Sequence, residues 1–244
     1  MGVSDHSPAR NRGPTSGSLG TVVVAAAGPM VGLALGRLTG HLPSTVGPLA
    51  RLAVGVTLYG AGLGAVAVAH LALTGRLGGL RRGRFDTRRL RLVVASTVAL
   101  VLAWVVAVVA LTLLGVPFAG NGLVSLAERG LRGSLLLLAA LSLLVIAPTE
   151  ELLYRGAVQS SLYEVTSRPR AVVLASVPFA LAHLPTLYAD TAAPSAVGLS
   201  LAAVFGLSIV FGWLHARTDD LLVPVAVHGA YNCAVFCLLY LVGT

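Results

Sequence analysis

Charged residues are scarce in this chain, lysine is missing and cysteine is almost missing. Only 11% of the 244 residues are charged, whereas a soluble domain carries about 25%. With 56% hydrophobic residues, this deficit excludes an ordinary soluble enzyme. The only cysteines, Cys233 and Cys237, lie one helical turn apart. They cannot link distant parts of the chain and do not have the spacing of a metal site.

The apolar residues form long unbroken runs. Because a helix rises 1.5 Å per residue, about 20 of them cross a bilayer core of ~30 Å. A membrane β-barrel needs short alternating segments instead. The sequence therefore predicts an all-α, polytopic transmembrane helical bundle of about seven spans (six to eight), after a disordered tail at 1–18. The predicted spans are 20–38, 52–74, 92–115, 133–162, 171–187, 196–216 and 221–242.

The net charge of +8 comes from arginines that cluster between the apolar runs. This position favours membrane orientation over nucleic-acid binding. The loop after the second span is the most basic, which predicts that it is cytoplasmic. Alternation then predicts a cytoplasmic N-terminus for a multi-pass protein of the cell membrane. The basic residues of that loop are Arg76, Arg81, Arg82, Arg84, Arg88, Arg89 and Arg91.

Two adjacent acids, Glu150 and Glu151, lie inside the fourth predicted span. A carboxylate near the bilayer centre costs at least ~2.5 kcal/mol, so such acids usually have a function and a partner. Glu151 and Arg155 are four residues apart and can pair on one helix face. Glu150 is rotated by about 100° and faces elsewhere. One acid is thus neutralised locally, and the other needs a different partner.

Two further polar motifs follow in later spans. Phe179 and His183 lie four residues apart in the fifth span, and His228 and Asn232 lie four residues apart in the last. Each motif alone is as typical of helix packing as of catalysis. The predicted depths put both histidines near the level of Glu150. Together these groups are a set that can activate water and bind an oxyanion.

The three motifs, Glu-Glu-x-x-x-Arg, Phe-x-x-x-His and His-x-x-x-Asn, occur in this order on successive apolar segments. In this the chain resembles the CPBP intramembrane proteases, which include the CAAX prenyl endopeptidases and bacteriocin-processing and immunity proteins. The resemblance covers about residues 133–242. We therefore assign 133–242 to a protease core and 19–132 to N-terminal transmembrane helices that act as a scaffold.

The resemblance implies an intramembrane endopeptidase site that opens to the cytoplasmic side. Glu150 would be the general base for water, assisted by His183, and His228 and Asn232 would hold the oxyanion. Glu151, Arg155 and Phe179 would support them. The implied partners are the lipid bilayer and a membrane-embedded protein or peptide substrate. The family offers prenylated tails as one substrate class, and nothing in this sequence identifies a prenyl groove.

Metal dependence is left open by the sequence. One Glu and two His, here Glu150, His183 and His228, could hold zinc and leave a position for water. No His-Glu-x-x-His helix is present, and a Glu–His pair can activate water without metal. We favour the interpretation that no cofactor is required, with a divalent metal such as zinc as the alternative.

Other functions fit the sequence less well. Zinc site-2 proteases need His-Glu-x-x-His, rhomboids need Gly-x-Ser-Gly, and presenilin-like proteases need two intramembrane aspartates, none of which is present. A proton-coupled transporter could use the same polar groups, but no inverted repeat is evident. The main alternative is a non-catalytic binding or bacteriocin-immunity protein on the same fold.

Overall fold

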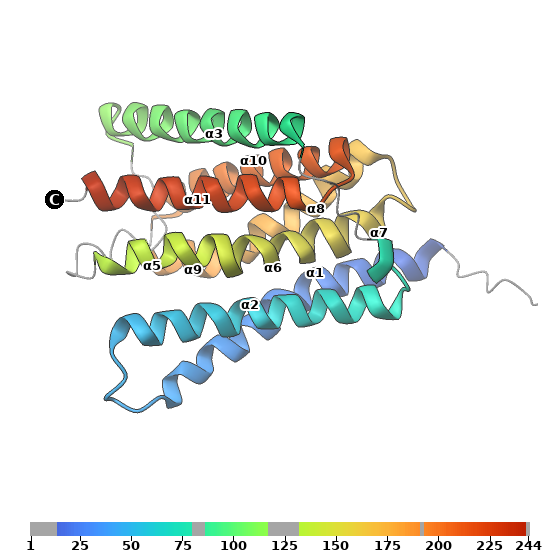
Figure 1. Cartoon of the computed structure of the whole chain (residues 1–244), viewed down its shortest axis with the longest axis horizontal. Coiled ribbons are helices and arrows are strands. Elements are labelled where there is room, and N and C mark those ends of the chain that lie inside the picture. Colours follow the sequence, from blue (N-terminus) through green and yellow to red (C-terminus); the bar gives the residue numbers. More distant parts are fainter. Residues whose placement is uncertain (1–13, 80–85, 117–131, 191–192, 243–244) are drawn as a thin grey trace, which may run out of the picture.

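The computed structural model describes residues 14–79, 86–116, 132–190 and 193–242, and all secondary structure in these ranges is helical (Figure 1). Seven helical stretches are long and apolar enough to cross a membrane, which confirms the predicted count. They are Gly20–His41, Pro48–Leu73, Thr87–Leu113, Gly133–Leu162, Arg168–Ala189, Pro194–Thr218 and Leu222–Val242. The protein is therefore a multi-pass membrane protein.

The first three spans correspond to helices α1 (Pro14–Gly36), α2 (Pro48–Leu73) and α3 (Thr87–Leu113), with the short 3-10 helices η1 (Arg37–His41) and η2 (Leu77–Gly79) at their ends. Of the predicted tail, 1–13 lies outside the described residues, and α1 already begins at Pro14. Proline suits the first helical turn because its missing N–H has no helical partner there. The first helix therefore starts earlier than the apolar run that predicted it.

Helix α3 also begins before its apolar run. Asp86 caps it by accepting a hydrogen bond of 2.8 Å from the backbone N–H of Arg89. A capping aspartate satisfies one of the free N–H groups at a helix start. The basic first turn of α3 is thus helical, although hydrophobicity alone places the start of the span near residue 92.

The fourth span is a composite helix. It consists of α5 (Gly133–Leu141), the π-helical segment η3 (Ser142–Ile146), α6 (Ala147–Glu151), the π-helical segment η4 (Leu152–Gln159) and α7 (Ser160–Leu162). π-Helical turns are rare and frequently occur at functional sites. Pro148 in α6 contributes to the irregularity because it has no N–H to donate. The two acids therefore lie in a short α-helical segment between two π-helical ones.

The remaining spans are α8 (Arg168–Ala182) with α9 (Leu184–Asp190), α10 (Pro194–Thr218) and α11 (Leu222–Val242). The fourth span packs against α1, α2, α8 and α11 and is therefore central in the bundle. Helices α1 and α2 lie together on one side of it, and α3 lies beyond α11 on the other (Figure 1).

Close helix contacts on the α1–α2 side depend on glycine. A Cβ built on Gly62 would lie 2.6 Å from the Cα of Gly32, and one built on Gly60 would lie 2.4 Å from Val145 Cγ1. Small residues let membrane helices approach closely. These glycines bring α1 against α2, and α2 against the segment that leads to Glu150.

Ion pairs join three loops at one end of the bundle. Arg76 pairs with Glu164, Arg89 with Asp220 at 3.2 Å, and Arg168 with Asp219 at 2.8 Å. These loops are among those that the arginine distribution assigns to the cytoplasm. The three loops lie at the same end of the bundle, as alternating spans require. The cytoplasmic orientation of the N-terminus stays a prediction.

Candidate active site

The predicted Glu151–Arg155 pair is present and fully buried, with exposed fractions of 0% and 1%. Arg155 Nη1 donates to Glu151 Oε1 at 3.2 Å. Arg155 Nε lies 3.2 Å from Glu151 Oε2 as an ion pair without hydrogen-bond alignment. The other guanidinium nitrogen, Nη2, donates to the backbone oxygen and to Oγ of Ser208, each at 2.8 Å. This arginine therefore ties the fourth span to α10.

Aromatic rings enclose the Arg155 guanidinium. Its central carbon lies 4.7 Å from the centroid of Phe179 and 5.6 Å from that of Phe211. A cation over an aromatic face gains electrostatic stabilisation, about 2 kcal/mol or more where water is excluded. Phe179 thus has a defined supporting role: it covers the charge of Arg155 from α8.

His228 is held by the same ion pair. Its Nδ1 lies 2.9 Å from Glu151 Oε1. Because a carboxylate paired with arginine can only accept, Nδ1 carries the hydrogen and donates it. The His228 ring also stacks on Phe211, with centroids 4.7 Å apart. Glu151 therefore does more than brace its own helix: it fixes the orientation of His228.

The opposite nitrogen of His228 faces the second acid. Nε2 lies 3.9 Å from Oε2 of Glu150, which is 6% exposed. This spacing is too long for a hydrogen bond, and the two groups attract each other only when the ring is protonated. The neighbouring Gly229 permits the approach of α11, because a Cβ there would lie 3.3 Å from the Cα of Leu143. The structure thus brings Glu150, Glu151 and His228 together.

His183 is linked to this group through Phe179. The two rings lie 4.9 Å apart, and the Phe179 ring lies 6.1 Å from that of His228. His183 Nδ1 lies 2.9 Å from the backbone oxygen of Phe179. A carbonyl oxygen can only accept, so Nδ1 carries the hydrogen and Nε2 of the neutral ring is a free acceptor. This tautomer suits a general base.

Asn232 lies one turn after His228 on α11 and is half-buried. In the described part of the chain its side chain makes no hydrogen bond. It is the one predicted site residue that the structure does not join to the others by a contact. Its amide is therefore available to a ligand at the same helix face as His228.

Three of these residues are also the candidate metal ligands. Among the residues that the structure describes, no three His, Cys, Asp or Glu side chains are grouped so that they could hold a metal ion. The candidate zinc set of Glu150, His183 and His228 is therefore not assembled in this conformation. Metal dependence stays an open prediction.

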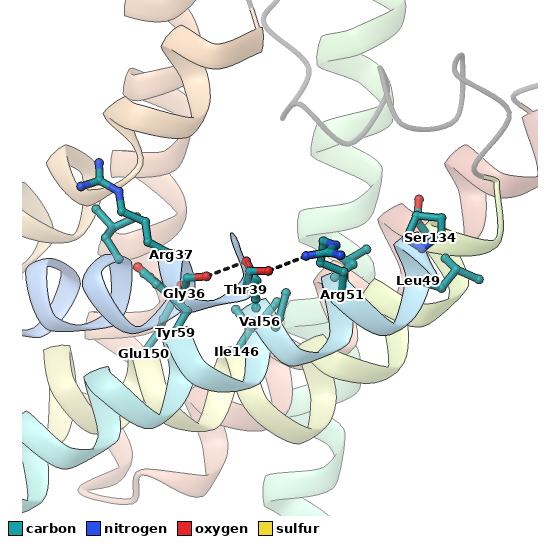
Figure 2. Close-up of a pocket in the computed structure, with 14 residues that line it drawn as sticks. Gly36, Arg37, Thr39, Leu49, Arg51, Val56, Tyr59, Ser134, Ile146 and Glu150 are labelled. Carbon is teal, nitrogen blue, oxygen red and sulfur yellow. Dashed lines mark hydrogen bonds between the residues drawn. The ribbon is translucent and has the colours of Figure 1, made fainter. Parts of the chain in front are cut away.

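A cavity of about 640 Å³ opens beside Glu150 (Figure 2). Its wall is mostly apolar and comes from α1, η1, α2 and the fourth span. Glu150 and Tyr59 are at one end, and Leu49 and Ser134 are at the other (Figure 2). Arg51 holds η1 against α2 by donating to the backbone oxygen of Thr39. The N-terminal helices thus form one wall of the space that leads to Glu150.

Comparison with known proteins adds independent information. Residues 132–234 match the family described as type II CAAX prenyl endopeptidase Rce1-like. This match, over less than half of the chain, supports a CPBP family intramembrane protease. The matched range includes all the site residues predicted from the sequence, from Glu150 to Asn232. The comparisons with curated proteins and with solved structures gave no match.

Several residues of this candidate site could not be found from the sequence. In the sequence, Ser208 looks like an ordinary small residue for helix packing. Only the structure shows its contact with Arg155. Phe211 and Tyr59 belong to apolar spans and are part of no recognisable motif. Only the pairing of residues far apart in the chain gives them a role, and one sequence carries no signal for that pairing.

Proposed function

We propose that this protein is an endopeptidase that hydrolyses a peptide bond of a membrane-associated protein or peptide. One observation carries the proposal: Glu150 is almost fully buried, and its Oε2 has no hydrogen-bond partner in the described residues. That carboxylate borders a cavity and lies beside an oriented histidine. A buried polar atom without a partner is costly, so a site of this kind is best explained by a ligand that completes it.

In this mechanism, Glu150 takes a proton from a water molecule, and the resulting hydroxide attacks the peptide carbonyl carbon. His183, whose Nε2 is a free acceptor, assists the proton transfer. His228 and Asn232 hold the oxyanion. When both ring nitrogens of His228 are protonated, Nδ1 donates to Glu151 and Nε2 to the oxyanion. General-base catalysis contributes about 10²–10⁴-fold, and one oxyanion donor about 10²–10³-fold.

Glu151 and Arg155 do not touch the reacting atoms in this mechanism. Their charges balance each other, and the shared carboxylate holds the His228 ring in one tautomer. A pre-oriented donor costs no reorganisation during the reaction. The proton taken by Glu150 is returned to the leaving nitrogen, so the C–N bond breaks without releasing an amide anion.

The experiment compares cleavage of a fluorogenic peptide panel by wild type and Glu150→Gln in lipid vesicles, with farnesylated and unmodified membrane peptides in the panel. We expect Glu150→Gln to lower kcat at least 10²-fold, because an amide cannot accept the proton. The matched control is Glu164→Gln, which changes an exposed acid in the loop after the fourth span. Cleavage by Glu150→Gln at the wild-type rate would contradict the proposal.

A chelator arm in the same assay tests the metal alternative. The metal-free mechanism predicts an unchanged rate after chelation. Loss of cleavage that zinc restores would instead support the set Glu150, His183 and His228 as ligands. If the protein is instead a non-catalytic binding or immunity protein, we expect the wild type to cleave no peptide of the panel.

A further inference from the structure

Three polar groups near the Glu150 end of the cavity have no hydrogen-bond partner among the residues that the structure describes. Oε2 of Glu150 and the hydroxyl of Tyr154 are buried and unbonded, and Tyr154 is only 1% exposed. The hydroxyl of Tyr59 likewise makes no hydrogen bond with any residue that the structure describes. Buried polar groups are nearly always paired, and leaving one unpaired costs about 1–3 kcal/mol. The two buried groups, with the half-buried Tyr59 hydroxyl beside them, call for one explanation.

These groups converge from two parts of the chain. Glu150 and Tyr154 are one turn apart in the fourth span, and Tyr59 comes from α2. Tyr59 packs against the apolar cluster that contains Tyr154, and it lines the cavity with Glu150 (Figure 2).

The position of Tyr59 is fixed from behind by α1. A Cβ built on Gly32 would lie 2.8 Å from Cδ2 of the Tyr59 ring and 2.9 Å from its backbone oxygen. Only glycine therefore allows α1 to pack this closely on Tyr59. A ring clamped in this way has little freedom to turn its hydroxyl elsewhere, as a pre-organised site requires.

We propose that Tyr59 and Tyr154, together with Glu150, form the binding site of the hydrolytic water, so that the N-terminal helices supply part of the catalytic site. A buried water needs two to four polar partners, which these groups provide. The inference rests on the proposed peptidase function and adds two tyrosines to it that the three sequence motifs do not specify.

The exposure of the two tyrosines separates their roles. Tyr154 is closed off from the cavity, so its hydroxyl oxygen accepts the second hydrogen of the water while Glu150 accepts the first. The lone pair of the water oxygen then forms the new bond to the carbonyl carbon, and the C=O π electrons move to oxygen. Tyr59 is half-buried on the cavity wall. Its O–H therefore reaches the water from the cavity side and donates to one lone pair of the water oxygen, which leaves the other lone pair to attack the carbonyl carbon.

Kinetics of Tyr59→Phe and Tyr154→Phe test the proposal, since phenylalanine keeps the ring and removes only the hydroxyl. We expect kcat to fall about 10–100-fold in each variant with little change in KM, because the lost bonds matter mainly in the transition state. The double variant should lose less than the product of the two factors, because both groups act on one water. Tyr188→Phe, at a 58% exposed position, is the control.

Thermal unfolding gives a readout that does not need a substrate. If a water pairs with the Tyr154 hydroxyl, Tyr154→Phe removes a made hydrogen bond and lowers Tm. If the hydroxyl has no partner, the same change removes an unpaired buried group and raises Tm. A raised Tm, or wild-type kcat in both tyrosine variants, would overturn the inference. The proposed function has a different test: it fails if Glu150→Gln cleaves like wild type.

Discussion

The two halves of the chain differ in what they bury. In the last four spans the interior holds charged and titratable side chains, including Glu150, Glu151, Arg155 and His228. In the first three spans, the buried positions that the structure describes are glycine, alanine, valine, leucine and Thr21. The C-terminal half therefore carries chemistry that is visible in its sequence. The N-terminal half shapes the space around that chemistry with residues that look ordinary.

The largest effect that tests this comparison is expected from the buried ion pair. Arg155→Met should lower the free energy of unfolding by about 3–5 kcal/mol, because it leaves the buried carboxylate of Glu151 without its counter-charge. It should also lower cleavage, since Glu151 then no longer holds His228 in place. Unfolding in mixed detergent micelles and the peptide assay measure the two effects.

A matched control replaces an arginine outside the interior. Arg217 is exposed and covers the ring of Trp213 at 5.2 Å, so Arg217→Met should cost about 1 kcal/mol or less. The double variant Glu151→Gln with Arg155→Met should recover part of the lost stability, because no buried charge remains unpaired. Equal losses for Arg155→Met and Arg217→Met would contradict the claim that the interior of the last four spans depends on a buried ion pair.

The sequence predicted the seven spans because hydrophobic length is a strong signal in a membrane protein. It also predicted the Glu151–Arg155 pair, because a spacing of four residues on a helix determines which side chains meet. Both predictions depend only on residues that are near one another in the chain. For the same reason, the polar motifs at Glu150, His183 and His228 could be recognised as a candidate site.

The contacts that complete the site could not be predicted in this way. The bond between Glu151 and His228 joins residues 77 positions apart. The π-helical segments around the two acids change the register of side chains within a span that the sequence presents as one continuous helix. Tyr59 depends on the close approach of two helices through Gly32. Such contacts follow from three-dimensional packing, for which a single sequence gives no periodic signal.

A second test concerns the glycine contact that sets α2 against the fourth span. Gly60→Ala should destabilise the fold by about 1–3 kcal/mol, because its Cβ would lie 2.4 Å from Val145 Cγ1 and overpack the interface. Cleavage should fall as well, since the shift moves Tyr59 and the cavity wall away from Glu150. Unfolding and kcat together report both consequences.

Gly64→Ala is the natural control, one turn further along the same helix. Its Cβ would lie 3.7 Å from Thr149 Cγ2, which is ordinary contact. Alanine is also the better helix former, so this change should be neutral or stabilising by up to about 1 kcal/mol. If Gly60→Ala and Gly64→Ala behave alike, α2 is not held at a specific distance from the site.

The smallest effect is expected from a change in α3. This helix belongs to the N-terminal half, but unlike α1 and α2 it does not form a wall of the cavity. This helix packs along α11 and lies away from the cavity (Figure 1), and Leu102 on it is 59% exposed. Leu102→Ala should change the free energy of unfolding by less than about 0.5 kcal/mol, as is usual for exposed sites, and leave kcat unchanged. Leu63→Ala, at a 0% exposed position on α2, should cost about 2–5 kcal/mol. A large effect at Leu102 would mean that α3, like α1 and α2, supports the site, and the boundary between scaffold and active site would have to move.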